Sequence, residues 1–347
     1  MNETIKADIQ NVLNSKYIDW IKLKNCNFFI TGATGLVASL LVKTLATQKK
    51  KAHDGGKIYI LVRSEEKAKS IYEDLIGDSI ILIQGDVREK FTIGDHIDYV
   101  IHAASITTSK YMVTNPVETL MTSILGTYNT LEFAKEHGVK GYIYISSMEV
   151  YGVTDVSQNP ITEDKLGYLD VLNVRSSYSE GKRACENMCV SYFKEYALPI
   201  KIARLAQIFG AGVRKDETKV FASFAKSALM GQDIVLHTNG ETMGNYCYTS
   251  DCVGALLCLL TKGNEGESYN IVNEDNSMEI KNMAKLVAKT LSFGKSKVIF
   301  DIPENQMLYG YAPETKLRLC GDKIRRLGWI PTVSLTEMYE RMVDGWK

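Results

Sequence analysis

The sequence has no excess of charge of either sign, since 41 Lys and Arg residues balance 41 Asp and Glu residues among 347. Binding to nucleic acid or to an acidic membrane surface depends on positive charge, so this balance argues against both partners and favours a small-molecule ligand. Residues 1–24 also lack the apolar run of a signal peptide or a membrane span. We therefore expect a cytoplasmic protein with a short N-terminal helical extension at 1–24.

Cysteines in a metal-binding pattern are missing as well. The seven cysteines run from Cys26 to Cys320 without a Cys-x-x-Cys pair or a histidine at ligand spacing. Cys185 and Cys189 lie four residues apart, but further ligands do not stand near them in the sequence. We expect no metal site, and the scattered thiols indicate a reducing compartment.

Short apolar runs alternate with helical segments over the first two hundred residues. The runs at 26–31, 57–62, 79–84, 99–102 and 141–146 are typical of buried parallel strands, and helices are predicted at 35–48, 64–75 and 119–137. This alternation predicts an α/β fold, a doubly wound parallel sheet with a smaller C-terminal α/β lobe. We assign 25–210 to the sheet domain, with a strand and helix near 245–262 returning to it, and 211–244 and 263–347 to the lobe.

A glycine-rich turn follows the first strand and opens a helix, in the order Thr-Gly-Ala-Thr-Gly-Leu-Val-Ala over 31–38. Such a run is either an ordinary strand-to-helix turn or a dinucleotide fingerprint. In the second case one glycine allows the tight turn, another allows the backbone to approach a pyrophosphate, and the helix N-terminus stabilises the anion. The residues expected to contact the cofactor here are Gly32, Thr34, Gly35, Leu36 and Val37.

The end of the second strand bears on which dinucleotide binds. NAD-binding proteins usually place an acid there, whereas this chain has Arg63 and Ser64. Arg63 is suited to the 2′-phosphate of NADP and equally to stacking on the adenine as a solvated side chain. We expect NAD or NADP as the cofactor, with the residue types favouring NADP.

Tyr178 and Lys182 lie four residues apart, on one face of a helix predicted at 177–196. A nearby ammonium stabilises a phenolate, so the pair is either an acid/base tyrosine with its activator or a solvated pair on a surface helix. Ser146 and Ser147 follow an earlier strand, where a hydroxyl can bind the same substrate oxygen as the tyrosine.

These motifs together resemble the extended short-chain dehydrogenase/reductases, the NAD-dependent epimerase/dehydratase family. The resemblance spans about 25 to the end of the chain and rests on the turn at 31–38, Gly85-Asp86-Val87, His102-Ala-Ala104, Gly126-Thr127, Ser146 to Gly152 and Tyr178-x-x-x-Lys182. It implies that 25–210 is an NAD(P)-binding Rossmann domain, that the C-terminal lobe binds a nucleotide-sugar substrate, and that the protein is a homodimer. It also implies the roles that follow. Tyr178 is the acid/base, Lys182 its activator and ribose ligand, and Ser147 the polarising hydroxyl. Further cofactor contacts are Asp86, Val87, Ala103 and Ala104, and substrate contacts are Ser105, Ser147, Gln207, Lys219, Val220 and Phe221.

The residues after Ser147 bear on the reaction. Dehydratases of the family carry an Asp-Glu pair there, and this chain has Met148-Glu149, which leaves Glu149 as a candidate base but weakens the dehydratase interpretation. Uronate decarboxylases share Glu149 and the run from Arg175 to Arg183, but have an arginine where this chain has Gly212. An epimerase acting through a keto intermediate is therefore the first expectation.

Two further departures concern the nucleotide. Gln207 replaces a diphosphate-contacting asparagine, and Gly244 replaces an arginine that binds the diphosphate in the family. Together with Arg63, the missing arginine favours an NADPH-dependent reductase of a nucleotide-linked keto sugar as the second expectation. A non-catalytic NADP-sensing regulator is the expectation from another class, and the intact Tyr178 and Lys182 count against it.

Overall fold

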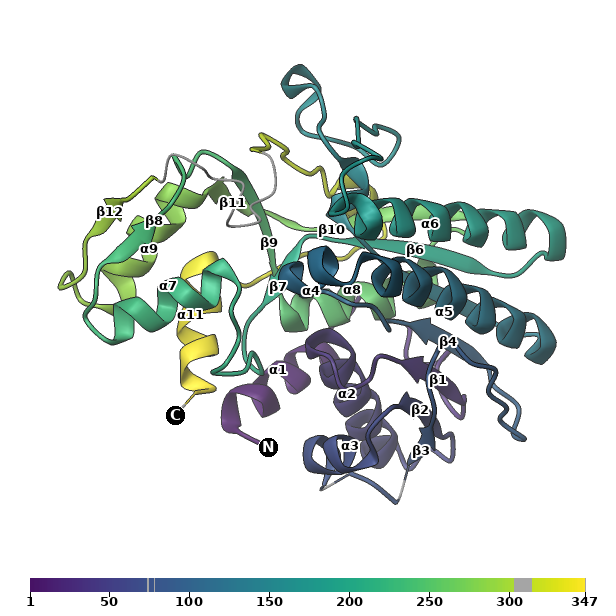
Figure 1. Cartoon of the computed structure of the whole chain (residues 1–347). Helices are drawn as coiled ribbons and strands as arrows, with labels where there is room; N and C mark the ends of the chain where they lie inside the picture. Colours follow the sequence, from purple (N-terminus) through teal and green to yellow (C-terminus); the bar gives the residue numbers. More distant parts are fainter. Residues whose placement is uncertain (74, 78, 303–313, 347) are drawn as a thin grey trace.

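Seven parallel strands form the central sheet, in the order β10-β6-β5-β4-β1-β2-β3 (Figure 1). The structure is a computed structural model that describes residues 1–73, 75–77, 79–302 and 314–346, so the lobe residues at 303–313 lie outside the described part. The predicted α/β doubly wound sheet is confirmed. The strands of this sheet are β1 Phe28–Thr31, β2 Ile58–Val62, β3 Ile80–Gln84, β4 Tyr99–His102, β5 Gly141–Ser147, β6 Ile200–Leu205 and β10 Glu267–Ile271.

Helices cover both faces of the sheet because its inner strands are apolar on both sides. In β1, Phe28 and Ile30 pack into a core with α2 and α8, whereas Phe29 packs into the opposite core with α5 and α6. All four residues of β1 are buried, as is typical of a parallel strand. The helices around the sheet are α2 Leu36–Ala52, α3 Glu65–Tyr72, α4 Ser109–Thr114, α5 Pro116–His137, α6 Ser176–Tyr196, α8 Thr249–Lys262 and α10 Asp322–Arg325, and the 3₁₀ turns are η1 Met148–Tyr151 and η2 Val156–Gln158.

Two smaller sheets and three helices form a separate apolar core at one side of the central sheet, on the left in Figure 1. Phe209 and Phe221 stack at its centre, with 4.5 Å between their ring centroids. This lobe contains β7 Gln207–Phe209, α7 Val220–Leu229, β8 Ile234–Leu236, β9 Met243–Tyr248, β11 Asn273–Glu279, α9 Ile280–Leu291, β12 Val298–Phe300 and α11 Leu335–Asp344.

The chain returns to the central sheet later than the sequence analysis places it. Helix α8 packs on the sheet as expected, but β9 pairs with β7 and β11 in the lobe. The strand that joins the central sheet is β10, within the range assigned to the lobe. Its apolar run is interrupted by the partly exposed Glu267 and Ser268 and by the buried Asn270, whose amide bonds to Tyr151, Ile161 and Cys320 inside the protein.

Helix α1, Glu3–Leu13, connects the two parts of the molecule. It packs against α2 and α8, and its buried Asp8 accepts hydrogen bonds from the Tyr248 hydroxyl at 2.6 Å and from Arg341 Nη1 in α11 at 3.1 Å. Burial raises the pKa of Asp8, while Tyr248 and Arg341 oppose the rise. The predicted N-terminal extension is therefore part of the packed structure.

Two general expectations concern thiols and membranes. All seven cysteines are free and buried. Among the described helices, none combines the length and the hydropathy that a membrane crossing requires.

Candidate active site

The glycine-rich turn lies where β1 ends, beside the end of β4. Gly32 has φ +66°, and a Cβ at this position would lie 2.6 Å from Ala103 C and from Ala104 N. The amide of Gly35 donates to Gly32 O at 2.9 Å and closes the turn into α2. Only glycine satisfies both the backbone angle and the close approach. The turn thus leaves open backbone at the helix N-terminus, as a dinucleotide pyrophosphate requires.

A buried polar cluster ties the end of β1 to the end of β4. Thr31 Oγ1 accepts hydrogen bonds from the amides of Ala103 and Ala104, both at 3.2 Å, and lies 2.7 Å from His102 Nδ1. Burial, followed by the charge of Lys182, lowers the pKa of His102 to about 3, so its ring is neutral at pH 7. This cluster fixes the backbone at Ala103 and Ala104 next to the glycine turn.

The candidate adenine-side residues lie at the ends of β2 and β3. Arg63 is exposed, and Ser64 caps α3 by accepting from the Lys67 amide at 3.2 Å. Asp86 is held by Arg88, whose hydrogen bonds are the main cause of its lowered pKa, and Arg63 lowers it further through its charge. Val87 is buried. Arg63 is therefore close enough to Asp86 to affect it, while its guanidinium stays accessible.

The Ser105 hydroxyl, three residues after β4, is a polar group that indicates a ligand at the carboxyl ends of the strands. The hydroxyl of Ser105 is buried, and the described residues give it no hydrogen-bond partner. A buried hydroxyl is rarely left unsatisfied. The open turn at Gly32 fits a bound dinucleotide, and the Ser105 hydroxyl is a further polar group that a ligand at this edge of the sheet would satisfy.

Tyr178 and Lys182 lie on the face of α6 that packs on β5. Both are buried, and Lys182 Nζ donates to Ile145 O at 2.7 Å and lies 5.9 Å from the Tyr178 ring centroid. Burial lowers the pKa of Lys182 to about 8. Burial, followed by the charge of Glu149, raises the pKa of Tyr178, while a hydrogen bond with Ser147 and the charge of Arg175 oppose the rise.

The two serines at the end of β5 have different partners. Ser146 Oγ donates to Glu186 Oε1 at 2.6 Å inside the protein. Ser147 is half-buried, accepts from the Glu149 amide at 3.2 Å, and lies close enough to Tyr178 to oppose the rise in the pKa of that phenol. The structure thus brings Ser147, rather than Ser146, to Tyr178.

Arg175 is a site residue to which the sequence analysis assigned no role. Its Nη2 lies 2.9 Å from both carboxylate oxygens of Glu149, and its guanidinium carbon lies 6.0 Å from the Tyr178 ring centroid. Arg175 precedes Tyr178 by three residues, as Lys182 follows it by four. Extending the helical spacing backwards would therefore have placed Arg175 on the same face.

The lobe residues predicted to contact substrate have varied surroundings. Gln207 and Lys219 are half-buried and Val220 is exposed, but Phe221 is only 3% exposed and belongs to the lobe core. At Gly244, a Cβ would lie 2.1 Å from the Tyr246 hydroxyl oxygen. Tyr246 thus occupies the space that an arginine at 244 would need, which explains why this chain has glycine there.

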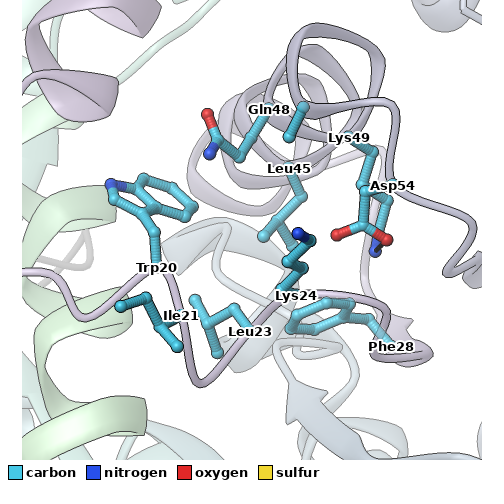
Figure 2. A pocket seen from close by; sticks show the side chains of 10 residues that line it. Trp20, Ile21, Leu23, Lys24, Phe28, Leu45, Gln48, Lys49 and Asp54 are labelled. Carbon is cyan, nitrogen blue, oxygen red and sulfur yellow. Dashed lines mark hydrogen bonds and ion pairs between the residues drawn. The ribbon is translucent and has the colours of Figure 1, made fainter.

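A pocket and a group of possible metal ligands are two other candidate sites, and charged groups in both are already paired within the protein. A pocket of about 190 Å³ lies at the C-terminal end of α2, the end opposite the glycine turn (Figure 2). Its Lys49 is already bonded to Cys26 O at 2.9 Å and to Asp54 at 3.2 Å. Among the described residues, one group of possible metal ligands comes together: Glu274, Cys320 and Asp322. Arg325 donates to both of its carboxylates and compensates their charge.

The chain matches the model of the NAD dependent epimerase/dehydratase family over residues 28–273. It belongs to this family. The family's extended short-chain dehydrogenase/reductase type, expected from the motifs, is confirmed, and the protein is an enzyme of that type.

Individual relatives fall into more than one reaction class. UDP-glucuronic acid decarboxylase 1 of Danio rerio is 30% identical over 316 residues, which cover 91% of this chain and 71% of the relative. UDP-glucose 4-epimerase of Thermotoga maritima, solved with UDP-glucose, has a TM-score of 0.75 at 22% identity, covering 92% of this chain and 98% of that chain. The dTDP-glucose 4,6-dehydratase DesIV of Streptomyces venezuelae, solved with NAD and TYD, has a TM-score of 0.74 at 20% identity and covers 92% and 96%.

Proposed function

We propose that this family member transfers hydride between a carbon of a nucleotide-linked sugar and a nicotinamide cofactor, with Tyr178 as the acid/base. The observation that carries the proposal is the placement of Tyr178 and Lys182, buried together on α6 beside Ser147, at the same sheet edge as the glycine turn. Ligands of open α/β sheets bind outside the carboxyl ends of the strands, where this site lies.

The roles of the site residues follow from their chemistry. A bound nicotinamide supplies a reversible hydride acceptor. Tyr178 takes the proton of a sugar hydroxyl as the hydride leaves the same carbon, and Ser147 holds that oxygen. Lys182 keeps a positive charge close to the phenolate. The turn from Gly32 to Val37 holds the pyrophosphate, with Ala103, Ala104, Asp86 and Val87 along the cofactor.

Epimerisation through a keto intermediate is the specific reaction that the geometry favours. It needs a tyrosine, a lysine and a hydroxyl, all of which are present. Met148 stands where a dehydratase has an acid. Gly212 stands where uronate decarboxylases have an arginine, so position 212 provides no positive charge for a substrate carboxylate. Arg214, two residues later, is exposed and pairs with Asp216.

Decarboxylation of a nucleotide-linked uronate is the second candidate. It is favoured by Glu149, which Arg175 holds next to Tyr178 as a second acid/base group, and by the similarity to UDP-glucuronic acid decarboxylases. Under either reaction, Gln207, Lys219, Val220 and Ser105 are the proposed substrate contacts. Phe221 would act from the lobe core, by shaping the pocket.

The choice of cofactor separates these reactions from the reductase alternative. The exposed Arg63 keeps NADP open, and an NADPH-dependent reductase of a keto sugar would draw on external cofactor. We test this by denaturing the purified protein and identifying the released dinucleotide by mass spectrometry. Near-stoichiometric NAD supports a self-contained cycle, and an empty protein that consumes NADPH supports the reductase.

Incubation with UDP-, dTDP- and CDP-sugars, followed by NMR of the products, then identifies the reaction. Inversion at one sugar carbon supports the epimerase. Loss of carbon dioxide from UDP-glucuronate supports the decarboxylase. Absence of any sugar conversion together with tight NADP binding would instead support the regulator.

We also propose a homodimer through α5 and α6. Val117, Met121 and Tyr128 of α5 are exposed apolar side chains, which a partner subunit would cover. Size-exclusion chromatography tests this, and a monomer would contradict it. A cytoplasmic location stays a prediction from composition.

A further inference from the structure

We propose that Arg175 is a positioning residue that holds the carboxylate of Glu149 beside Tyr178 and neutralises its charge there. The inference deepens the proposed function and rests on Tyr178 acting as the acid/base. It concerns a residue outside the Tyr178-Lys182 pair, at the point where the chain enters α6.

The contacts fix both partners of this ion pair. Arg175 Nη2 lies 2.9 Å from Glu149 Oε1 and from Oε2, and Ser179 Oγ donates to Oε2 at 3.3 Å. The side chain of Arg175 is 16% exposed and that of Glu149 is 35% exposed, so the arginine is mostly enclosed while water reaches part of the carboxylate. Glu149 is thus held from the helix side by two groups that flank Tyr178 in sequence.

The helix repeat explains why these groups converge. Residues 178 and 179 follow 175 by three and four positions, and 182 follows them by four and three, so the four side chains form one stripe along the helix. That face is directed at the end of β5 and at η1, which carries Glu149. The arrangement places a cation, a phenol and a hydroxyl around one carboxylate.

The charges around Tyr178 affect the pKa of its phenol. The groups that face Tyr178 are Glu149 from η1, Arg175 from the turn before α6, Ser147 from β5 and Lys182 from α6 itself. Burial and Glu149 raise the pKa of Tyr178, and Ser147 and Arg175 lower it. Without Arg175, an unpaired carboxylate would oppose the ionisation that catalysis requires.

The test replaces Tyr178 with a ring-fluorinated tyrosine, whose phenol is more acidic, in the protein as purified with its cofactor. Fluorine NMR then follows the ionisation of this residue without any substrate. The variants are Arg175→Met, Arg175→Lys, Glu149→Gln and the double variant Arg175→Met/Glu149→Gln. Glu180→Gln, a carboxylate change on the same helix, is the matched control.

We expect Arg175→Met to raise the pKa of the fluorinated residue by about one unit, as the unmasking of a neighbouring charge does. Glu149→Gln should lower it, and the double variant should return it towards the value of the parent protein. Arg175→Lys, which keeps the charge, should stay close to the parent, and Glu180→Gln should leave the pKa unchanged.

An arginine with a merely structural role predicts no recovery in the double variant, because removing the carboxylate would not repair a loosened helix end. That result, or an unchanged pKa in Arg175→Met, overturns the inference. The titration needs no turnover, so it is separable from the proposed function. If sugars are converted but the titrations do not shift, only the role of Arg175 fails; if the titrations shift but sugars are not converted, only the proposed function fails.

Discussion

At the scale of single residues, the candidate site contains a buried amine, Lys182, whose positive charge lowers the stability of the folded protein. Lys182 is buried and its pKa is lowered to about 8, which means that the folded protein resists its charged form. Lys182 Nζ donates to the backbone carbonyl of Ile145. Among the described residues, no carboxylate lies at ion-pair distance from it. The proposed function accounts for this buried amine by its charge near Tyr178.

Replacing Lys182 with methionine should therefore stabilise the protein while abolishing turnover. The lowered pKa means that charging Lys182 costs folding energy at pH 7, and after subtracting one lost hydrogen bond we expect a gain of about 2 kcal/mol. Because the folded-state pKa lies below the usual 10.5, this gain should shrink as the pH rises from about 8 towards 10.5. Urea unfolding at several pH values measures it, and a variant less stable than the parent at pH 7 would contradict it.

At the scale of elements, α6 is joined to the sheet beneath the site by a buried ion pair. Arg204 of β6 donates from Nε to Glu186 Oε1 at 3.0 Å and from Nη2 to Glu186 Oε2 at 2.7 Å. Ser146 Oγ donates to the same carboxylate at 2.6 Å. Arg204 also reaches the Tyr151 hydroxyl at 3.0 Å. The pair therefore connects α6, β6, β5 and η1.

Arg204→Met should destabilise the protein by about 3–5 kcal/mol, because it leaves the carboxylate of Glu186 buried without its cation. The double variant Arg204→Met/Glu186→Met should be clearly more stable than Arg204→Met alone, since the uncompensated charge is gone. Chemical denaturation of both variants measures the difference. Equal stabilities would show that the pair does not act as a unit.

Comparison of the predicted helices and strands with those of the structure shows how far the sequence predicts the fold. The inner strands and α6 lie where expected, because strands buried on both faces and helices with an apolar stripe leave periodic signals. Strand β10 was missed because Glu267, Ser268 and the buried Asn270 interrupt its apolar run. The Arg175–Glu149 pair was missed because it joins two segments whose distance in space depends on the folded sheet. Gly244 and Tyr246 lie two residues apart on β9, so their side chains share one face of the strand, and the period-two spacing of a strand could have indicated this contact.

At the scale of the whole molecule, α1 links the Rossmann domain to the lobe through Asp8. This carboxylate is 1% exposed and contacts Tyr248, next to α8, and Arg341 of α11. The lobe is thereby fixed relative to the glycine turn at Gly32 by a segment outside the family match, which begins at residue 28.

Asp8→Ala should destabilise the protein by about 1–3 kcal/mol, because the buried Tyr248 hydroxyl loses its acceptor. The matched control is Glu3→Ala in the same helix, where the ion pair with Lys6 is exposed and a much smaller loss than in Asp8→Ala is expected. Thermal unfolding of the two variants gives the comparison. Similar losses in both would mean that Asp8 does not fix α1.

The central claim is that Tyr178 exchanges a proton with a nucleotide-linked sugar during hydride transfer. The most direct test mixes the cofactor-loaded protein with the sugar nucleotide that it converts and follows nicotinamide absorbance in a single turnover, for the parent and for Tyr178→Phe. We predict that Tyr178→Phe keeps the cofactor content and the melting temperature but slows hydride transfer by several orders of magnitude, roughly 10³-fold or more. Hydride transfer at the parental rate in Tyr178→Phe would contradict the claim.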